Sequence, residues 1–112
     1  ISFTLFLSNP ADYEGGELAF QLLQGSKEIR LPAGHIVLYP STCLHCVQPV
    51  VSGTRLVCVG WIESYIQSIE DRSMLFNLDA GAKGLLARHG RSDELDLIFQ
   101  SYANAVRRLS GR

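Results

Sequence analysis

Two cysteine thiols and one imidazole stand close together in the stretch STCLHC, residues 41–46. A Cys-x-x-Cys pair supplies half of a structural zinc site, which needs four ligands and usually a second such pair. The remaining residues of these types are Cys58, His35 and His89. They form no second close pair, and in an extended segment Cys43 and Cys46 face opposite sides. The spacing therefore disfavours zinc. The missing βαβ pattern also disfavours a redox motif, so we interpret the three cysteines as small buried apolar residues.

His45 offers different chemistry, because Arg55 follows ten residues later across a turn. A hairpin of that length would place the two side chains on neighbouring strands. Arg55 interrupts an apolar strand and shares a face with Val57, Val59 and Trp61. An inward arginine is costly unless an anion meets it, and its planar fork matches a carboxylate. The residues alone predict a histidine beside a carboxylate-binding arginine at one end of a β-sandwich. The alternative is a hydrogen-bonded core or rim histidine, with Arg55 facing solvent.

Short apolar segments separated by turn residues make up the first part of the chain. Such spacing favours an antiparallel sandwich or jelly roll. We expect a polar loop over residues 12–16 and a tight hairpin turn at Ser52-Gly53. The expected strands cover residues 1–7, 17–23, 27–31, 35–39, 44–50 and 54–62.

A helical period begins near residue 68 and continues to the end of the chain. The first helix has the apolar positions Leu75, Leu78, Ala82, Leu85 and Leu86. Gly90 is a plausible stop, and Ser92 before two acidic residues is a typical helix start. The second amphipathic helix has the apolar positions Leu95, Ile98, Phe99, Tyr102, Val106 and Leu109. We therefore divide the chain into a β-region, residues 1–66, and a helical extension, residues 67–112.

The bulk composition excludes several classes of partner. The formal net charge of the 112 residues is -1, so no phosphate-seeking surface and no nucleic-acid partner are expected. The apolar runs are strand-sized and fall short of the roughly 20 residues that span a bilayer. The odd count of three cysteines favours reduced thiols and a cytoplasmic location. The chain opens inside an apolar alternation, and we expect the protein to extend upstream of Ile1.

Three segments in one order, LFLSNPADYEGGEL, LPAGHIVLYPSTCLHCVQPV and GTRLVCVGWIES, resemble the PKHD-type hydroxylases. These are bacterial members of the Fe(II)/2-oxoglutarate dioxygenase superfamily, related to prolyl 4-hydroxylases. The resemblance extends into the helical region, where RSMLFNLD stands at the matching place. It implies a double-stranded β-helix, or jelly roll. Residues 1–66 would form the C-terminal part of that core, its first strands missing, and residues 67–112 would form the helical extension.

The same resemblance implies cofactors and roles for individual residues. The cofactors are Fe(II), 2-oxoglutarate and O2, with ascorbate as a candidate reductant. His45 matches the distal histidine ligand of the iron, within a two-histidine, one-carboxylate triad. Arg55 matches the residue that binds the distal carboxylate of 2-oxoglutarate. Gly15 and Gly16 are interpreted as structural, and Glu17 as a hydrogen-bonding residue at the barrel rim. Trp61 lines the pocket or, as we favour, packs in the core.

One element of the family pattern is missing, because no His-x-Asp pair occurs in the chain. We expect that pair upstream of Ile1, so the chain alone would bind iron weakly and be inactive. A relative that has lost its metal, and a partial barrel completed by another chain, are the alternatives. A cupin-like binding module without redox chemistry is the competing function. Residues 68–110 are also a candidate module for pairing helices in a homo-oligomer, and the primary substrate stays open.

Overall fold

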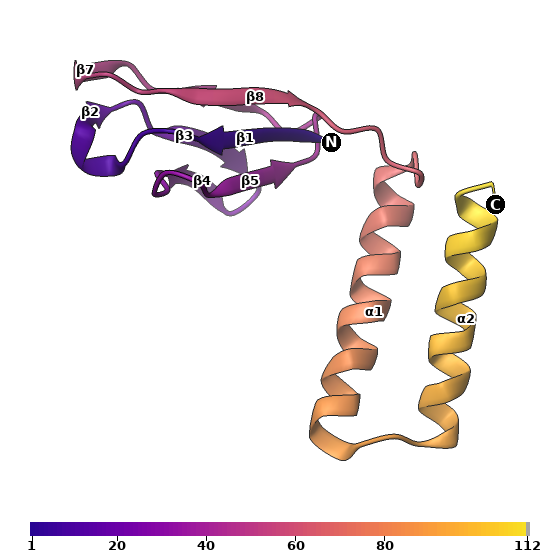
Figure 1. Ribbon diagram of the computed structural model, residues 1–112. Helices are drawn as coiled ribbons and strands as arrows, with labels where there is room; N and C mark the ends of the chain where they lie inside the picture. The colour runs from indigo at the N-terminus through magenta and orange to yellow at the C-terminus, as the bar shows by residue number, and fades with distance from the viewer. Residues whose placement is uncertain (112) are drawn as a thin grey trace. The chain divides into compact units, whose positions relative to one another are not determined.

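The computed structural model describes residues 1–111, which divide into two compact units. The first unit, Ile1–Ile62, contains eight strands and one short 3-10 helix, and the second, beginning at Glu63, contains two helices (Figure 1). This confirms a β-region followed by C-terminal helices. The contacts separate the units between residues 62 and 63, whereas the sequence pattern suggested residues 66 and 67.

The strands form three small antiparallel sheets with the orders β5-β1-β8, β4-β3-β6 and β2-β7. The elements of this unit are β1 (Ser2–Phe6), the 3-10 helix η1 (Pro10–Asp12), β2 (Tyr13–Gly15), β3 (Leu18–Leu22), β4 (Gly25–Ile29), β5 (Ile36–Tyr39), β6 (His45–Val47), β7 (Val50–Gly53) and β8 (Val57–Trp61). Every sheet therefore joins segments that are far apart in the sequence.

The buried face of β1 carries Ser2, Thr4 and Phe6, whereas the alternate residues Phe3 and Leu5 are only half-buried. Period-2 alternation places one set of side chains inward, but both sets in β1 contain apolar residues. The inward set brings two hydroxyl groups into the interior. As a consequence, the wall that β1 offers to the interior is partly polar.

The hairpin expected at Ser52-Gly53 is wrong. Residues 50–53 form strand β7, which pairs with β2, where the sequence suggested a loop. Gly53 has φ +76°, and a Cβ there would lie 2.1 Å from the carbonyl oxygen of Asp12. The glycine thus permits close approach of a distant strand rather than a turn. The expected strand 44–50 is divided at Pro49, which has no N–H to donate to a ladder.

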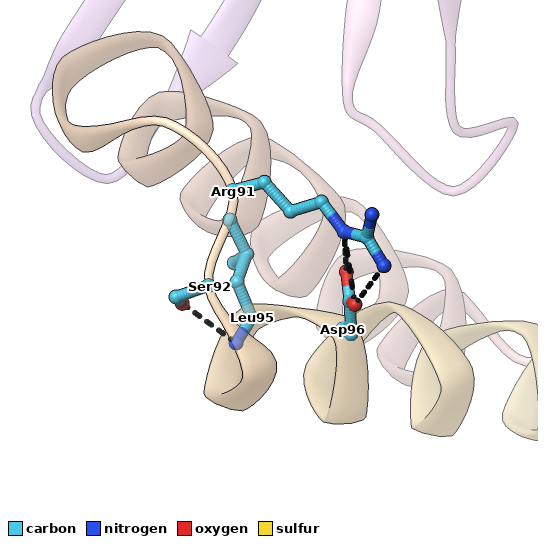
Figure 2. A network of polar contacts seen from close by, with 4 residues as sticks. All are labelled: Arg91, Ser92, Leu95 and Asp96. Carbon is cyan, nitrogen blue, oxygen red and sulfur yellow. Dashed lines mark hydrogen bonds and ion pairs between the residues drawn. The ribbon is translucent and has the colours of Figure 1, made fainter.

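Helix α1 ends and helix α2 begins at the residues that local signals indicated, and α1 begins close to residue 68 as expected. Helix α1 covers Ile69–His89 and helix α2 covers Asp93–Leu109. The Ser92 hydroxyl accepts a hydrogen bond from Leu95 N at 3.1 Å, and the neighbouring Arg91 forms a two-pronged ion pair with Asp96 (Figure 2). Gly90 ends α1, with its N–H bonded to the carbonyl of Leu86. The helix predictions are confirmed in position.

The apolar stripe predicted for α1 is only partly buried. Leu75 and Ala82 are buried, whereas Leu78, Leu85 and Leu86 remain exposed. Neither helix within residues 1–111 is sufficiently long and apolar to cross a bilayer.

The interpretation of the three cysteines as buried residues is wrong. Cys43 is half-buried, and Cys46 and Cys58 are exposed. All three residues of β6 are exposed, as are Cys58 and Val59 of β8. No layer of the described residues covers these strand faces. The exposure of Cys46 and Cys58 therefore follows that of their strands, although cysteine is among the most often buried residue types.

Candidate functional site

A cavity of about 410 Å³ lies in the β-unit and brings His45 and Arg55 to one site. They come from different sheets, since β6 pairs with β3 whereas Arg55 precedes β8, which pairs with β1. They are not on neighbouring strands, so the predicted hairpin pairing is wrong although the predicted association is present. Ser2, Thr4 and Trp61 contribute to the same lining.

His45 is held by its own strand and by two aromatic rings. It stands opposite Phe20 in the β3–β6 ladder, and its ring forms a T-shaped contact with the Tyr39 ring at a centroid distance of 4.9 Å. Its Nδ1 lies 2.7 Å from the carbonyl oxygen of Cys43. A carbonyl can only accept, so we assign the proton to Nδ1 and the lone pair to Nε2. A metal-binding histidine commonly uses this arrangement, with one nitrogen fixed by a carbonyl and the other left as a ligand.

Arg55 lies in the segment 54–56 between β7 and β8 rather than on a strand as predicted. It is half-buried, and its Nε is fully buried without a hydrogen-bond acceptor among residues 1–111. Its Cζ lies 5.9 Å from the centre of the Phe6 ring. A buried donor without an acceptor costs about 1–3 kcal/mol, and more when the group is charged. The geometry therefore suits an anionic ligand at this end of the cavity.

Gly16 provides the space for the Arg55 side chain. It has φ +67°, and a Cβ at this position would lie 2.9 Å from Arg55 Cδ and 3.0 Å from Val50 Cγ2. The structural role predicted for Gly15 and Gly16 thus has a physical explanation, because a Cβ at either position would meet neighbouring atoms. Gly15, with φ +73°, places its would-be Cβ 2.3 Å from the carbonyl oxygen of Pro49. Any larger residue at either position would displace backbone or the arginine.

Trp61 and Glu17 differ in their relation to the cavity. Trp61 lines it and is 83% exposed, so the core interpretation of this residue is wrong. The reason is its position on β8, an edge strand with a single hydrogen-bonded neighbour. Glu17 is half-buried and is not among the lining residues. Its backbone oxygen accepts a hydrogen bond from Gln48 N at 2.9 Å, which links β3 and β6 beyond the ladder.

Several cavity residues escaped sequence reasoning. The hydroxyl oxygens of Ser2 and Ser41 lie 2.8 Å apart, and Thr4 and Tyr39 complete this polar wall. Alternation along β1 divides its residues into two faces, but it does not say which face points inward. Burial of Phe6 would have identified Ser2 and Thr4, and only the tertiary structure shows that burial.

The described residues supply only part of a metal site. Within residues 1–111, no group of three or more histidine, cysteine, aspartate or glutamate side chains is placed to hold one ion. His45 fits a metal ligand through its Nε2, and the unpaired guanidinium of Arg55 fits an anionic cosubstrate. A complete two-histidine, one-carboxylate set would need two more ligands from outside these residues.

Comparison with known proteins gives consistent matches. The sequence profile of the 2OG-Fe(II) oxygenase superfamily matches residues 1–63. A PKHD-type hydroxylase of Synechococcus sp. (strain CC9902) is 87% identical over 112 residues, which are 100% of this chain and 50% of that relative. One of Synechococcus sp. (strain CC9605) is 70% identical over 98% of the chain and 50% of the relative. One of Prochlorococcus marinus (strain MIT 9313) is 64% identical over 97% and 49%. The chain therefore spans about half the length of these relatives.

Proposed function

The chain belongs to the 2OG-Fe(II) oxygenase superfamily, as its resemblance to the PKHD-type hydroxylases predicted, and on this basis we propose a hydroxylase function. The whole protein would couple oxidative decarboxylation of 2-oxoglutarate to hydroxylation of a C–H bond. The observation that carries the proposal is one cavity lined both by a histidine with an available Nε2 and by an arginine whose Nε has no acceptor among residues 1–111.

Each functional residue of this chain has a distinct task in the proposal. His45 Nε2 would hold Fe(II), and the Cys43 carbonyl would keep the imidazole in the required tautomer. Arg55 would bind the distal carboxylate of 2-oxoglutarate by charge-assisted hydrogen bonds. Leu18, a buried residue of the lining, would exclude water from its part of the cavity. Bound Fe(II) with O2 would supply the oxidising chemistry, and ascorbate would serve as the reductant that maintains the ferrous state.

The remaining ligands and the complete jelly roll are also part of the proposal. We propose that a His-x-Asp pair from outside these 112 residues joins His45 in the whole protein. The coverage of about half of each relative supports this source. A non-catalytic, cupin-like binding module with an anion site at Arg55 is the second candidate. The buried Nε of Arg55, which has no acceptor among residues 1–111, is the observation that fits this alternative.

The test compares His45→Ala with His35→Ala in the whole protein. His35 is exposed and does not line the cavity, so it is a matched histidine control. Fe(II)-dependent release of succinate from 2-oxoglutarate is measured without a primary substrate, since that substrate is unidentified. We expect His45→Ala to lower the rate at least about 100-fold, the upper end of the loss seen for residues that only support a metal ligand. His35→Ala should match the wild type.

The outcomes separate the two candidate functions. A wild type that binds 2-oxoglutarate but releases no succinate would identify the binding module. If the His45→Ala variant still releases succinate, His45 is not a ligand of the iron.

A further inference from the structure

The side chain of Arg30, the residue directly after β4, contacts the segment between β1 and β3. Its Nη2 donates to the carbonyl oxygens of Pro10 at 2.6 Å and Tyr13 at 2.5 Å. Its Cζ lies 4.6 Å from the centre of the Tyr13 ring. Among the described residues no carboxylate forms an ion pair with Arg30. The half-buried guanidinium of Arg30 therefore holds both the backbone and the ring of Tyr13.

The contacts of Tyr13 connect Arg30 to Arg55. The residue is 4% exposed, and its Cε2 lies 3.4 Å from the position that a Cβ of Gly16 would occupy. Arg55 Cδ lies 2.9 Å from the same position. The ring of Tyr13 and the stem of Arg55 therefore approach one glycine. In a closely packed interior, a shift of the ring changes the space available to the stem.

Tyr13, Arg30 and Arg55, which these contacts connect, each carry a buried polar atom without a partner among residues 1–111. Within residues 1–111, the buried side-chain polar atoms that lack a partner are Tyr13 Oη, Arg30 Nε and Arg55 Nε. Such groups reduce stability, and they call for an explanation beyond packing. The Tyr13 ring links the two arginines, because the Arg30 guanidinium lies over it and the Arg55 stem approaches the same glycine.

We infer that Arg30 is a positioning residue, which acts through Tyr13 and Gly16 to set Arg55 for the distal carboxylate of 2-oxoglutarate. The inference rests on the proposed function, because it takes Arg55 as the carboxylate anchor. Lysine could not replace Arg30 fully, because an ammonium group lacks the planar face that stacks on Tyr13.

The experiment compares Arg30→Met with Lys27→Met in the whole protein. Both changes remove one positive charge, and Lys27 is an exposed residue of β4, the strand that directly precedes Arg30. Isothermal titration calorimetry, with Mn(II) in place of Fe(II), gives the dissociation constants of 2-oxoglutarate and of 2-oxopentanoate. The second compound keeps the keto acid group but lacks the distal carboxylate. Thermal melting of each variant reports on folding.

We expect Arg30→Met to weaken 2-oxoglutarate binding about 10-fold, in the range of residues that support a ligand-binding group. Binding of 2-oxopentanoate should change less than about twofold, since Arg30 acts only on the distal carboxylate end. Lys27→Met should leave both constants unchanged. A loss confined to the dicarboxylate is a signature that a purely structural role would not produce.

Other outcomes would overturn the inference. Equal losses for both keto acids, with a lower melting temperature, would show that Arg30 only supports the fold. If Arg30→Met does not fold, Arg30→Lys keeps the charge and the donors, and unchanged selectivity in this variant would also remove the role. A wild type that binds both keto acids equally well would contradict the assignment of Arg55 itself. That result concerns the proposed function, and it is distinguishable from failure at Arg30 alone.

Discussion

The two units of the chain satisfy their polar groups in opposite ways. In the helical unit the Ser68 and Ser92 hydroxyls accept from backbone N–H groups in the first turns of α1 and α2. Arg91 donates through Nε and Nη2 to the Asp96 carboxylate (Figure 2). In the β-unit, Tyr13, Arg30 and Arg55 each retain a buried donor that has no acceptor among residues 1–111. Local partners stabilise the helical unit, whereas the β-unit holds hydrogen-bonding capacity that a ligand could use.

The largest expected difference is between the two arginines, Arg55 and Arg91. Arg55→Ala in the whole protein should weaken 2-oxoglutarate binding about 100-fold, since truncating one member of a buried charge pair costs roughly 2–5 kcal/mol. Arg91→Ala removes the same charge from a surface pair and should leave that affinity unchanged. Isothermal titration calorimetry of both variants is the measurement. Equal affinities for the two variants would remove the functional contrast between the units.

Glycine substitutions should act in opposite directions in the two units. Gly16→Ala should lower the free energy of unfolding by about 1–3 kcal/mol, because φ is +67° and the new Cβ meets Arg55 Cδ at 2.9 Å. Gly84→Ala, inside α1 with no atom within 4 Å of its would-be Cβ, should raise it by roughly 0.5–1 kcal/mol. Denaturant titrations followed by circular dichroism give both values. A lower free energy of unfolding for Gly84→Ala would contradict this prediction for the helical unit.

The smallest effect concerns pH and the helical unit alone. The hydrogen bond from Arg91 lowers the pKa of Asp96 below its usual value. A carboxyl with a depressed pKa in the folded state stabilises the fold above its unfolded pKa, about 3.9, and loses this contribution as pH falls through the folded value. We therefore expect the melting temperature of the wild type to exceed that of Asp96→Asn slightly at neutral pH. The gap should close below about pH 4. A gap that widens in acid would contradict the sign.

Short-range signals predicted the end of α1 and the start of α2, whereas the start of α1 was expected only near residue 68. Ser68, Gly90 and Ser92 act on backbone groups within four residues, so their effect is visible in a local window. The segments 1–7, 17–23 and 35–39 also contain the strands β1, β3 and β5. The exposure of Leu78, Leu85 and Leu86 was not predictable, because the helical period does not tell how wide a face its partner covers. Pairing of the helices between subunits stays a prediction.

The sequence by itself determined the chemistry available to this protein: one histidine and one arginine in a setting that suits a metal and a carboxylate. The tertiary structure decided how they meet. His45 lies on β6, which pairs with β3, whereas Arg55 precedes β8, which pairs with β1. Gly53 allows the close approach of β2 instead of forming a turn. Strand pairing joins residues far apart in the chain, and its register depends on which face becomes buried. No local window contains that information, whereas a helix cap is complete within one turn.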